Sequence, residues 1–217
     1  VIFSILTFLV AVPSAVKVFN WVATLYKGSI EMEPPLLFAL TFIFLFSIGG
    51  LTGLFPGALA TNVHLHDTYW VVGHFHYVIF GGTAFAVYGA LHYWFPKMFG
   101  RMYGKRIPYV AWIFLFIGFN ALYFSMLILG WEGMPRRYYD YLPQFHTLQL
   151  ISTIGSWILI TGLILMFSNL FYSLFKGKKG EDNPWGGATL EWQIPSPPPR
   201  ENFEKIPIVE KGPYDFR

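Results

Sequence analysis

The sequence predicts an all-α integral membrane protein with five transmembrane helices. Only 12% of the 217 residues are charged and 54% are apolar, whereas about a quarter of a soluble domain is charged. Five apolar runs are long enough to cross ~30 Å of hydrocarbon, which takes about 20 helical residues. Because lipid excludes unpaired strand edges, runs this rich in Phe, Leu and Ile are expected to be helices. A soluble enzyme and a disordered chain are excluded.

The first run lacks a preceding basic segment and a cleavage pattern, so we interpret it as a membrane span and not as a signal peptide. The chain opens on Val1, inside an apolar stretch, which indicates a processed, split or truncated polypeptide. The membrane region is expected over residues 1–176, with helices at about 3–26, 35–58, 69–95, 108–130 and 146–175.

Basic residues give the expected orientation of these helices. They gather in two segments that the alternation of spans places on one side: Lys97, Arg101, Lys105 and Arg106 after the third run, and Lys176, Lys178 and Lys179 after the fifth. The positive-inside rule puts both segments in the cytoplasm. Residues 177–217 are rich in proline and contain no long apolar run. We therefore expect an extended Pro-rich cytoplasmic tail.

Composition also limits the chemistry. Cysteine is absent, which excludes disulfides, thiolate zinc sites, iron–sulfur clusters and covalently attached c-type haem. The formal net charge of +3 is too small for a nucleic-acid surface. Any metal must be held by histidine, carboxylate or thioether groups.

The run NVHLHDTYWVVGHFHYV is the densest polar cluster, and it places His74 and His76 inside the third span. Ionisable residues at that depth are costly and indicate function. Residues i and i+2 point about 200° apart on a helix, so these rings cannot clamp one metal ion. Each ring can instead hold a separate large cofactor, such as haem, on its own side. The alternative is a pair of histidines that only hydrogen-bond neighbouring helices.

Two polar pairs lie at the expected outer face. His66 and Asp67 offer an imidazole and a carboxylate, which suit Mg²⁺ or Mn²⁺ completed by water and a partner chain; a solvated helix cap is the alternative. Arg136 and Arg137 lie where the positive-inside rule expects few cations, so they require an anionic partner. Outward-pointing haem propionates fit this requirement, and lipid phosphate is the alternative.

Lys17 lies in the middle of the first run and one turn beyond Ser14. A lysine at this depth reaches neither interface comfortably. With Ser14 it can line a water chain that carries protons, and a structural lysine bonded to carbonyl groups is the alternative. His92 and His146 lie near span ends, where interfacial hydrogen bonding accounts for both.

Four segments, in order, resemble one family. They are PSAVKVFNWVATL (13–25), HDTYWVVGHFHYV (66–78), GMPRRYYDY (133–141) and TLEWQIPSPPP (189–199). The chain resembles subunit I of the haem–copper oxygen reductases, the cytochrome c and quinol oxidase family. The resemblance implies that the five spans are helices eight to twelve, the C-terminal part of a twelve-helix bundle.

The resemblance also implies roles for individual residues. His74 matches the proximal ligand of the high-spin, oxygen-binding haem, and His76 matches an axial ligand of the low-spin haem. Phe75 matches an electron route between the haems, which are expected to be a-type. His66 and Asp67 match a Mg or Mn site at the interface with subunit II.

Arg136 and Arg137 match clamps for the haem propionates, and Lys17 with Ser14 matches a proton channel. The copper B ligands and the second low-spin ligand belong to earlier helices of the family. Many relatives carry an acid where this chain has Asn62. This difference affects which group holds the pumped proton.

The implied function is part of subunit I of a terminal respiratory oxidase that reduces O₂ to water and pumps protons. Cytochrome c is the expected electron donor. The expected partners are the N-terminal helices of subunit I, a subunit II with a dinuclear copper centre, subunit III and membrane lipid, in a bacterial inner membrane. The alternatives are a quinol oxidase, a nitric oxide reductase, a non-catalytic di-haem cytochrome and a haem-free scaffold.

Overall fold

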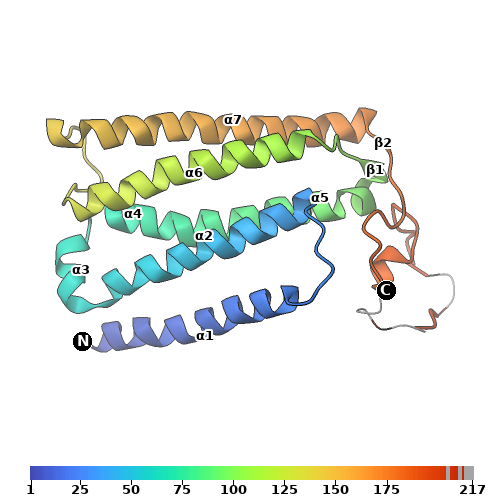
Figure 1. The fold of residues 1–217 in the computed structure, drawn as a ribbon, viewed down its shortest axis with the longest axis horizontal. Coiled ribbons are helices and arrows are strands. Elements are labelled where there is room, and N and C mark those ends of the chain that lie inside the picture. The colour runs from blue at the N-terminus through green and yellow to red at the C-terminus, as the bar shows by residue number, and fades with distance from the viewer. Residues whose placement is uncertain (204–205, 210–211, 213–217) are drawn as a thin grey trace.

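A computed structural model describes residues 1–203, 206–209 and 212. Five long apolar helices run side by side and form most of the molecule (Figure 1). They confirm the expected all-α membrane fold. Positions 204–205, 210–211 and 213–217 of the expected tail lie outside the described residues.

The long helices match the expected runs to within a few residues. They are α1 (Ile2–Leu25), α2 (Pro34–Gly57), the composite third span of α4 (Tyr69–His76), the π-helix η1 (Tyr77–Ala84) and α5 (Phe85–Phe99), then α6 (Ile107–Trp131) and α7 (His146–Lys176). Short elements connect them: α3 (Leu59–Leu65), β1 (Arg101–Met102), the 3-10 helix η2 (Pro143–Phe145), β2 (Lys178–Lys179) and the 3-10 helix η3 (Leu190–Trp192).

Close helix contacts position the third span. A Cβ atom added to Gly130 of α6 would lie only 1.7 Å from the backbone nitrogen of Trp70, so α4 and α6 approach each other at a position that only glycine permits. Large apolar side chains fill the space between the helices, including Phe38, Phe85 and Phe119, which are fully buried. Small residues at such contacts are typical of membrane helices, which gain stability from close packing.

The first helix is the least attached. None of the residues of α1 is buried. Its Trp21 ring packs edge-on against Phe42 of α2, with the ring centroids 4.6 Å apart. Most of the apolar surface of α1 therefore stays exposed in this chain.

The tail is more compact than the extended chain that we expected. The Lys97 ammonium donates hydrogen bonds to the carbonyl oxygens of Asp182, at 3.0 Å, and Ile194, at 2.7 Å. It also lies 5.2 Å from the centroid of the Trp192 ring. Trp192 is only 2% exposed, and its indole nitrogen donates to the Tyr93 hydroxyl. These contacts fold residues 182–194 against the end of α5, which we call the tail end of the bundle.

We expect Lys97→Met to loosen this part of the tail. The variant loses two hydrogen bonds from a charged donor, and such bonds contribute about 1.5–3 kcal/mol each. Proteinase K should cut between residues 182 and 194 at least 10-fold faster in the assembled protein, because a 10-fold change corresponds to only ~1.4 kcal/mol. Mass spectrometry of timed digests measures this rate. Lys27→Met, which removes an exposed lysine elsewhere, should leave the rate unchanged; equal rates in both variants would contradict the role of Lys97.

Candidate cofactor and metal site

His74 faces α2. Its Nδ1 atom lies 3.0 Å from the carbonyl oxygen of Gly49 and 3.2 Å from the Thr52 hydroxyl. Gly53 makes room for the ring, because a Cβ atom there would lie 2.7 Å from Cε1 of His74. A carbonyl group can only accept, so Nδ1 carries the proton and Nε2 keeps its lone pair.

His76 faces α6 instead. Its ring stacks on Tyr123 with the centroids 4.2 Å apart, and its Nδ1 atom lies 2.8 Å from the carbonyl oxygen of Val72 in its own helix. In the described part of the chain, Nε2 of neither His74 nor His76 makes a hydrogen bond. The two rings therefore contact different helices, and each retains a free ligating nitrogen. Phe75 lies between them in sequence, with its ring 4.3 Å from that of His76.

The π-helix η1 begins directly after the histidine pair, at Tyr77. Tyr77 is fully buried, and its hydroxyl donates a 2.8 Å hydrogen bond to the side chain of Asn120 on α6. Single π segments inside α-helices occur frequently at functional sites. We did not predict this element, which contains the buried glycines Gly81 and Gly82.

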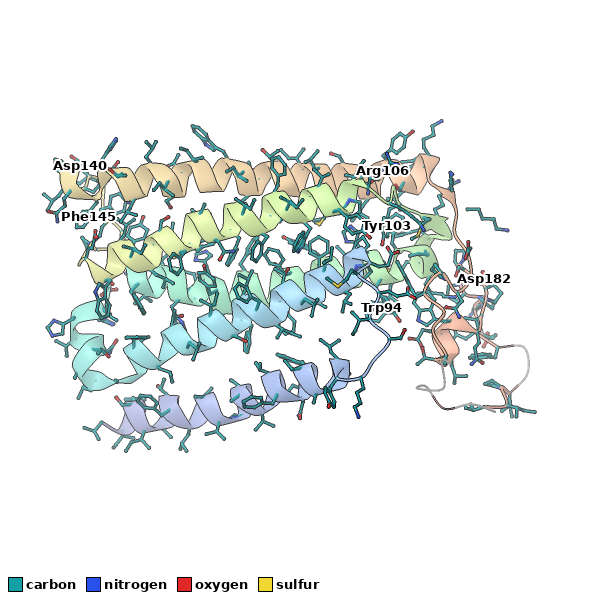
Figure 2. All side chains as sticks on the ribbon, in the orientation of Figure 1. Trp94, Tyr103, Arg106, Asp140, Phe145 and Asp182 are labelled. Carbon is teal, nitrogen blue, oxygen red and sulfur yellow. The ribbon has the colours of Figure 1, made fainter. Side chains whose placement is uncertain are left out.

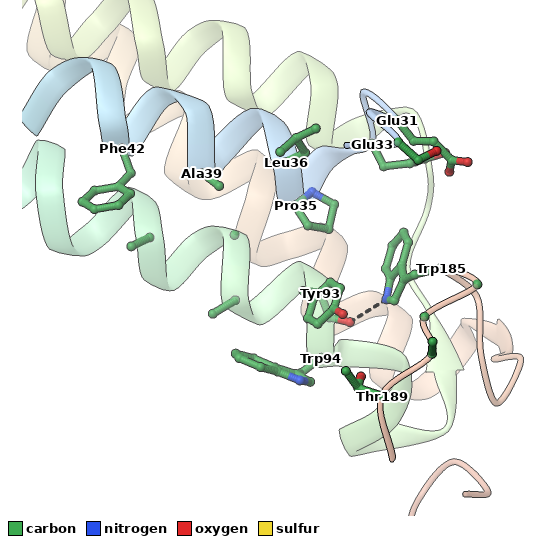
Figure 3. Close-up of a pocket in the computed structure, with 17 residues that line it drawn as sticks. Glu31, Glu33, Pro35, Leu36, Ala39, Phe42, Tyr93, Trp94, Trp185 and Thr189 are labelled. Carbon is green, nitrogen blue, oxygen red and sulfur yellow. Dashed lines mark hydrogen bonds between the residues drawn. The ribbon is translucent and has the colours of Figure 1, made fainter. Parts of the chain in front are cut away.

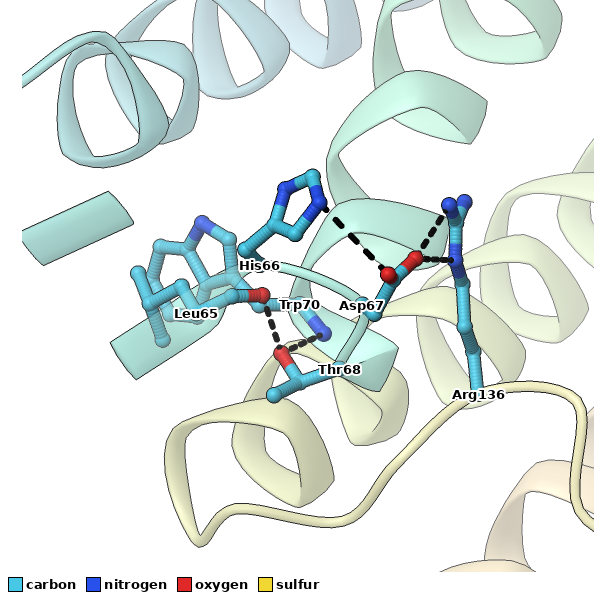
Figure 4. Close-up of polar contacts among 6 residues, drawn as sticks. All are labelled: Leu65, His66, Asp67, Thr68, Trp70 and Arg136. Carbon is cyan, nitrogen blue, oxygen red and sulfur yellow. Dashed lines mark hydrogen bonds and ion pairs between the residues drawn. The ribbon is translucent and has the colours of Figure 1, made fainter. Parts of the chain in front are cut away.

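The opposite end of the bundle from the tail carries a polar loop contact (Figure 4). Arg136 binds the Asp67 carboxylate, with Nε at 2.8 Å and Nη2 at 2.5 Å from the same oxygen. His66 Nε2 lies 3.5 Å from the other oxygen of Asp67. The backbone reinforces the contact, since the Arg136 amide donates to the Asp67 carbonyl. Asp67 and Arg137 both have left-handed backbone conformations, with φ of 57° and 62°.

The electrostatics of this loop favour a charged carboxylate. The hydrogen bond from Arg136 is the main cause that lowers the pKa of Asp67 below its ordinary 3.8. Asp67 is consequently ionised at neutral pH. Within the described residues, no group of three or more His, Cys, Asp or Glu side chains could hold a metal ion. A metal at His66 and Asp67 therefore requires ligands from water or from another chain.

The predicted proton-path residues lie apart from the histidine pair and from the contact between Asp67 and Arg136. The Ser14 hydroxyl donates to the Val10 carbonyl in its own helix, at 3.1 Å. Lys17 is exposed on α1, 5.5 Å from the centroid of the Trp21 ring. His92, near the end of α5, is fully buried, and its Nδ1 atom lies 2.7 Å from the Tyr88 carbonyl oxygen in the same helix.

A cavity of about 740 Å³ lies away from His74 and His76, at the tail end (Figure 3). It is bounded by α2, α5 and the tail, with Glu31 and Glu33 at its rim and Trp94 and Trp185 on its walls. The Trp185 indole nitrogen donates to the Tyr93 carbonyl. None of the residues that we predicted as ligands lines this cavity.

Comparisons with known proteins identify the family. The family model described as "Cytochrome C and Quinol oxidase polypeptide I" matches residues 1–158. The chain belongs to this family. Cytochrome c oxidase subunit 1 of Thermostichus vulcanus is 47% identical over 99% of the chain and 39% of its own length. The corresponding subunit of Synechocystis sp. is 48% identical over 97% of the chain and 38% of its own length.

A solved structure shows the same fold. A heme-copper terminal oxidase dimer matches with a TM-score of 0.71 and 22% identity, over 82% of the chain and 37% of the matched chain. The chain spans less than two fifths of the length of these curated oxidase relatives. This share fits the C-terminal portion that we expected of a larger subunit.

Proposed function

We propose that the chain is part of subunit I of a proton-pumping terminal oxidase that reduces O₂ to water, with cytochrome c as the electron donor. One observation carries the proposal: two intramembrane histidines face different helices, each with a free Nε2 atom, in a chain of the oxidase family. The relatives named cytochrome c oxidase subunit 1 support the choice of donor.

The histidines fit haem ligation. A metal-bound histidine usually donates its second ring N–H to a carbonyl, which fixes the ring and the tautomer. His74 does this toward Gly49 and His76 toward Val72. His74 would hold the iron of a high-spin haem and His76 that of a low-spin haem, both a-type. When bound, the first haem supplies the oxygen-binding iron and the second supplies a one-electron relay.

The polar loops at the end of the bundle opposite the tail would bind charged groups of the cofactors. Arg136 and Arg137 would bind the haem propionates, and Arg136 retains its Nη1 atom for this purpose while it holds Asp67. His66 and Asp67 would bind Mg²⁺ or Mn²⁺ with subunit II, because both side chains are exposed toward a partner. Phe75 would provide the short apolar path for electrons between the two histidines.

Lys17 and Ser14 would line a proton path. Both lie on α1, whose apolar surface is exposed in this chain. The N-terminal helices of subunit I would cover this surface and supply the copper B ligands. Protons would then enter from the cytoplasm, where we place the tail, and pass Lys17 toward the side of His74.

The complete enzyme would contain these N-terminal helices, subunit III and a subunit II with the dinuclear copper centre, in a bacterial inner membrane. A quinol oxidase, which the family description also includes, would take electrons without that copper centre. A nitric oxide reductase or a non-catalytic di-haem cytochrome would not consume O₂. Oxygen uptake with reduced cytochrome c, compared with uptake with quinol, separates these functions.

We expect His74→Ala and His76→Ala to have different spectral effects in the intact enzyme. His74→Ala should abolish carbon monoxide binding and keep the low-spin absorption band, because the two rings lie against different helices. His76→Ala should remove the low-spin band and keep the high-spin haem. Reduced-minus-oxidised spectra with and without carbon monoxide measure both effects.

His146→Ala is the matched control. This histidine is exposed and contacts Tyr141, whose hydroxyl lies 3.4 Å from its Nδ1 atom, so both spectra should be unchanged. If either of the His74 and His76 substitutions removed both signals equally from a folded, haem-loaded enzyme, the assignment of one haem to each ring would be wrong.

Lys17→Met should retain both haem spectra but slow the reduction of the oxygen-binding site at least 10-fold. Each electron that enters a buried site needs a compensating proton, and Met cannot carry one. Stopped-flow absorbance follows the rate. Lys27→Met removes a lysine from the loop after α1 and should reduce at the normal rate. Normal kinetics in Lys17→Met would exclude this residue from the proton path.

A further inference from the structure

The residues just before α6 and those at and after the C-terminal end of α7 form a cationic surface that the functions above do not use. The short antiparallel pair β1–β2 joins Arg101 to Lys179 and Met102 to Lys178. It brings together two basic segments that are far apart in the sequence. The surface, which we call the basic patch, contains five exposed cations: Lys105, Arg106, Lys176, Lys178 and Lys179. Arg106 marks its position in Figure 2.

The backbone beneath the patch is well fixed. The Arg101 guanidinium donates to the Gly177 carbonyl at 2.9 Å, and the Asn169 amide donates to the Gly104 carbonyl at 3.2 Å. Gly177 permits a close approach, because a Cβ atom there would lie 2.7 Å from the Met102 carbonyl oxygen. The five cations are therefore held near one another by a folded support.

Within the described part of the chain, these cations have no partner in an ion pair or a side-chain hydrogen bond. Across residues 1–203, 206–209 and 212, none of the five side chains makes an ion pair or a hydrogen bond. Glu181 and Asp182 follow the patch directly, but the Asp182 carboxylate accepts the Ser196 amide at 2.8 Å and so is engaged in the tail. Five like charges at one site repel one another, so an anionic partner would stabilise the patch.

Apolar side chains next to the patch indicate what that partner is. Phe175 is 75% exposed and Tyr172 66% exposed on α7, and Ile107 is 42% exposed on α6. Ile107 begins α6, and Tyr172 and Phe175 lie in the last two turns of α7, so all three are at the ends of candidate membrane-spanning helices. A soluble acidic protein would bind the cations without covering these side chains, whereas a phospholipid matches both features with its phosphate and its acyl chains.

We propose that the basic patch and the adjoining apolar side chains bind the headgroup of an anionic phospholipid. The lipid phosphate lies over the β1–β2 pair, between the start of α6 and the end of α7. The acyl chains run down past Phe175 and Ile107. Recognition is electrostatic, so a zwitterionic phospholipid binds this site much more weakly than phosphatidylglycerol.

The test uses the intact oxidase in micelles that contain equal amounts of phosphatidylglycerol and phosphatidylcholine. Native mass spectrometry counts the lipids that each complex retains. Lys105→Gln/Arg106→Gln and Lys178→Gln/Lys179→Gln should each weaken retention of phosphatidylglycerol about 10-fold, since each basic group near an anionic headgroup contributes several-fold in affinity. Retention should also fall as salt increases.

Lys27→Gln/Arg200→Gln is the matched control, because it removes two exposed cations outside the patch. It should retain phosphatidylglycerol as the unmodified enzyme does, and the haem spectra of all variants should report an intact fold. Equal retention in the patch variants and the control, or equal retention of phosphatidylcholine and phosphatidylglycerol, would overturn the proposal. A protein segment that covers the patch would give the first of these results.

Discussion

An imidazole at membrane depth is stable only when its ring N–H has an acceptor, because lipid offers none and an unpaired polar group costs several kcal/mol there. The third span meets this constraint twice. His74 uses a carbonyl of α2 and His76 uses a carbonyl of its own helix. Each hydrogen bond fixes the orientation and the tautomer of its imidazole ring. Glycines make this arrangement possible: Gly53 on α2 leaves room for the His74 ring, and Gly130 on α6 permits the close approach of α4.

The proposed ligation of two haems requires such fixed rings. A ligand that rotated freely would hold an iron in many positions, whereas electron transfer between two haems needs a constant separation. The His74 and His76 side chains leave one short helical segment toward different neighbours. A single span can therefore connect two cofactors. Arg136 and Asp67 belong to the same design, because their ion pair and backbone hydrogen bond tie the loop after α6 to the start of α4.

Much of this arrangement could be predicted from the sequence. The five helices follow from apolar runs, and the divergence of His74 and His76 follows from their i, i+2 spacing. The ion pair between Asp67 and Arg136 could not be predicted, because the residues are 69 positions apart and each pattern allowed another partner. The π-helix was missed because hydropathy does not distinguish the hydrogen-bond pattern of a π-helix from that of an α-helix. The compact tail was missed because it depends on Lys97, a residue that we used only for orientation.

A density map of the intact oxidase, resolved well enough to place side chains, tests the central claim most directly. We predict that Nε2 of His74 and Nε2 of His76 each point at a separate haem iron, on different sides of the third span. We also predict that Nδ1 of His74 stays on the Gly49 carbonyl. Both rings bound to one metal, or Nε2 of either ring bonded to a protein group with no iron nearby, would contradict the account.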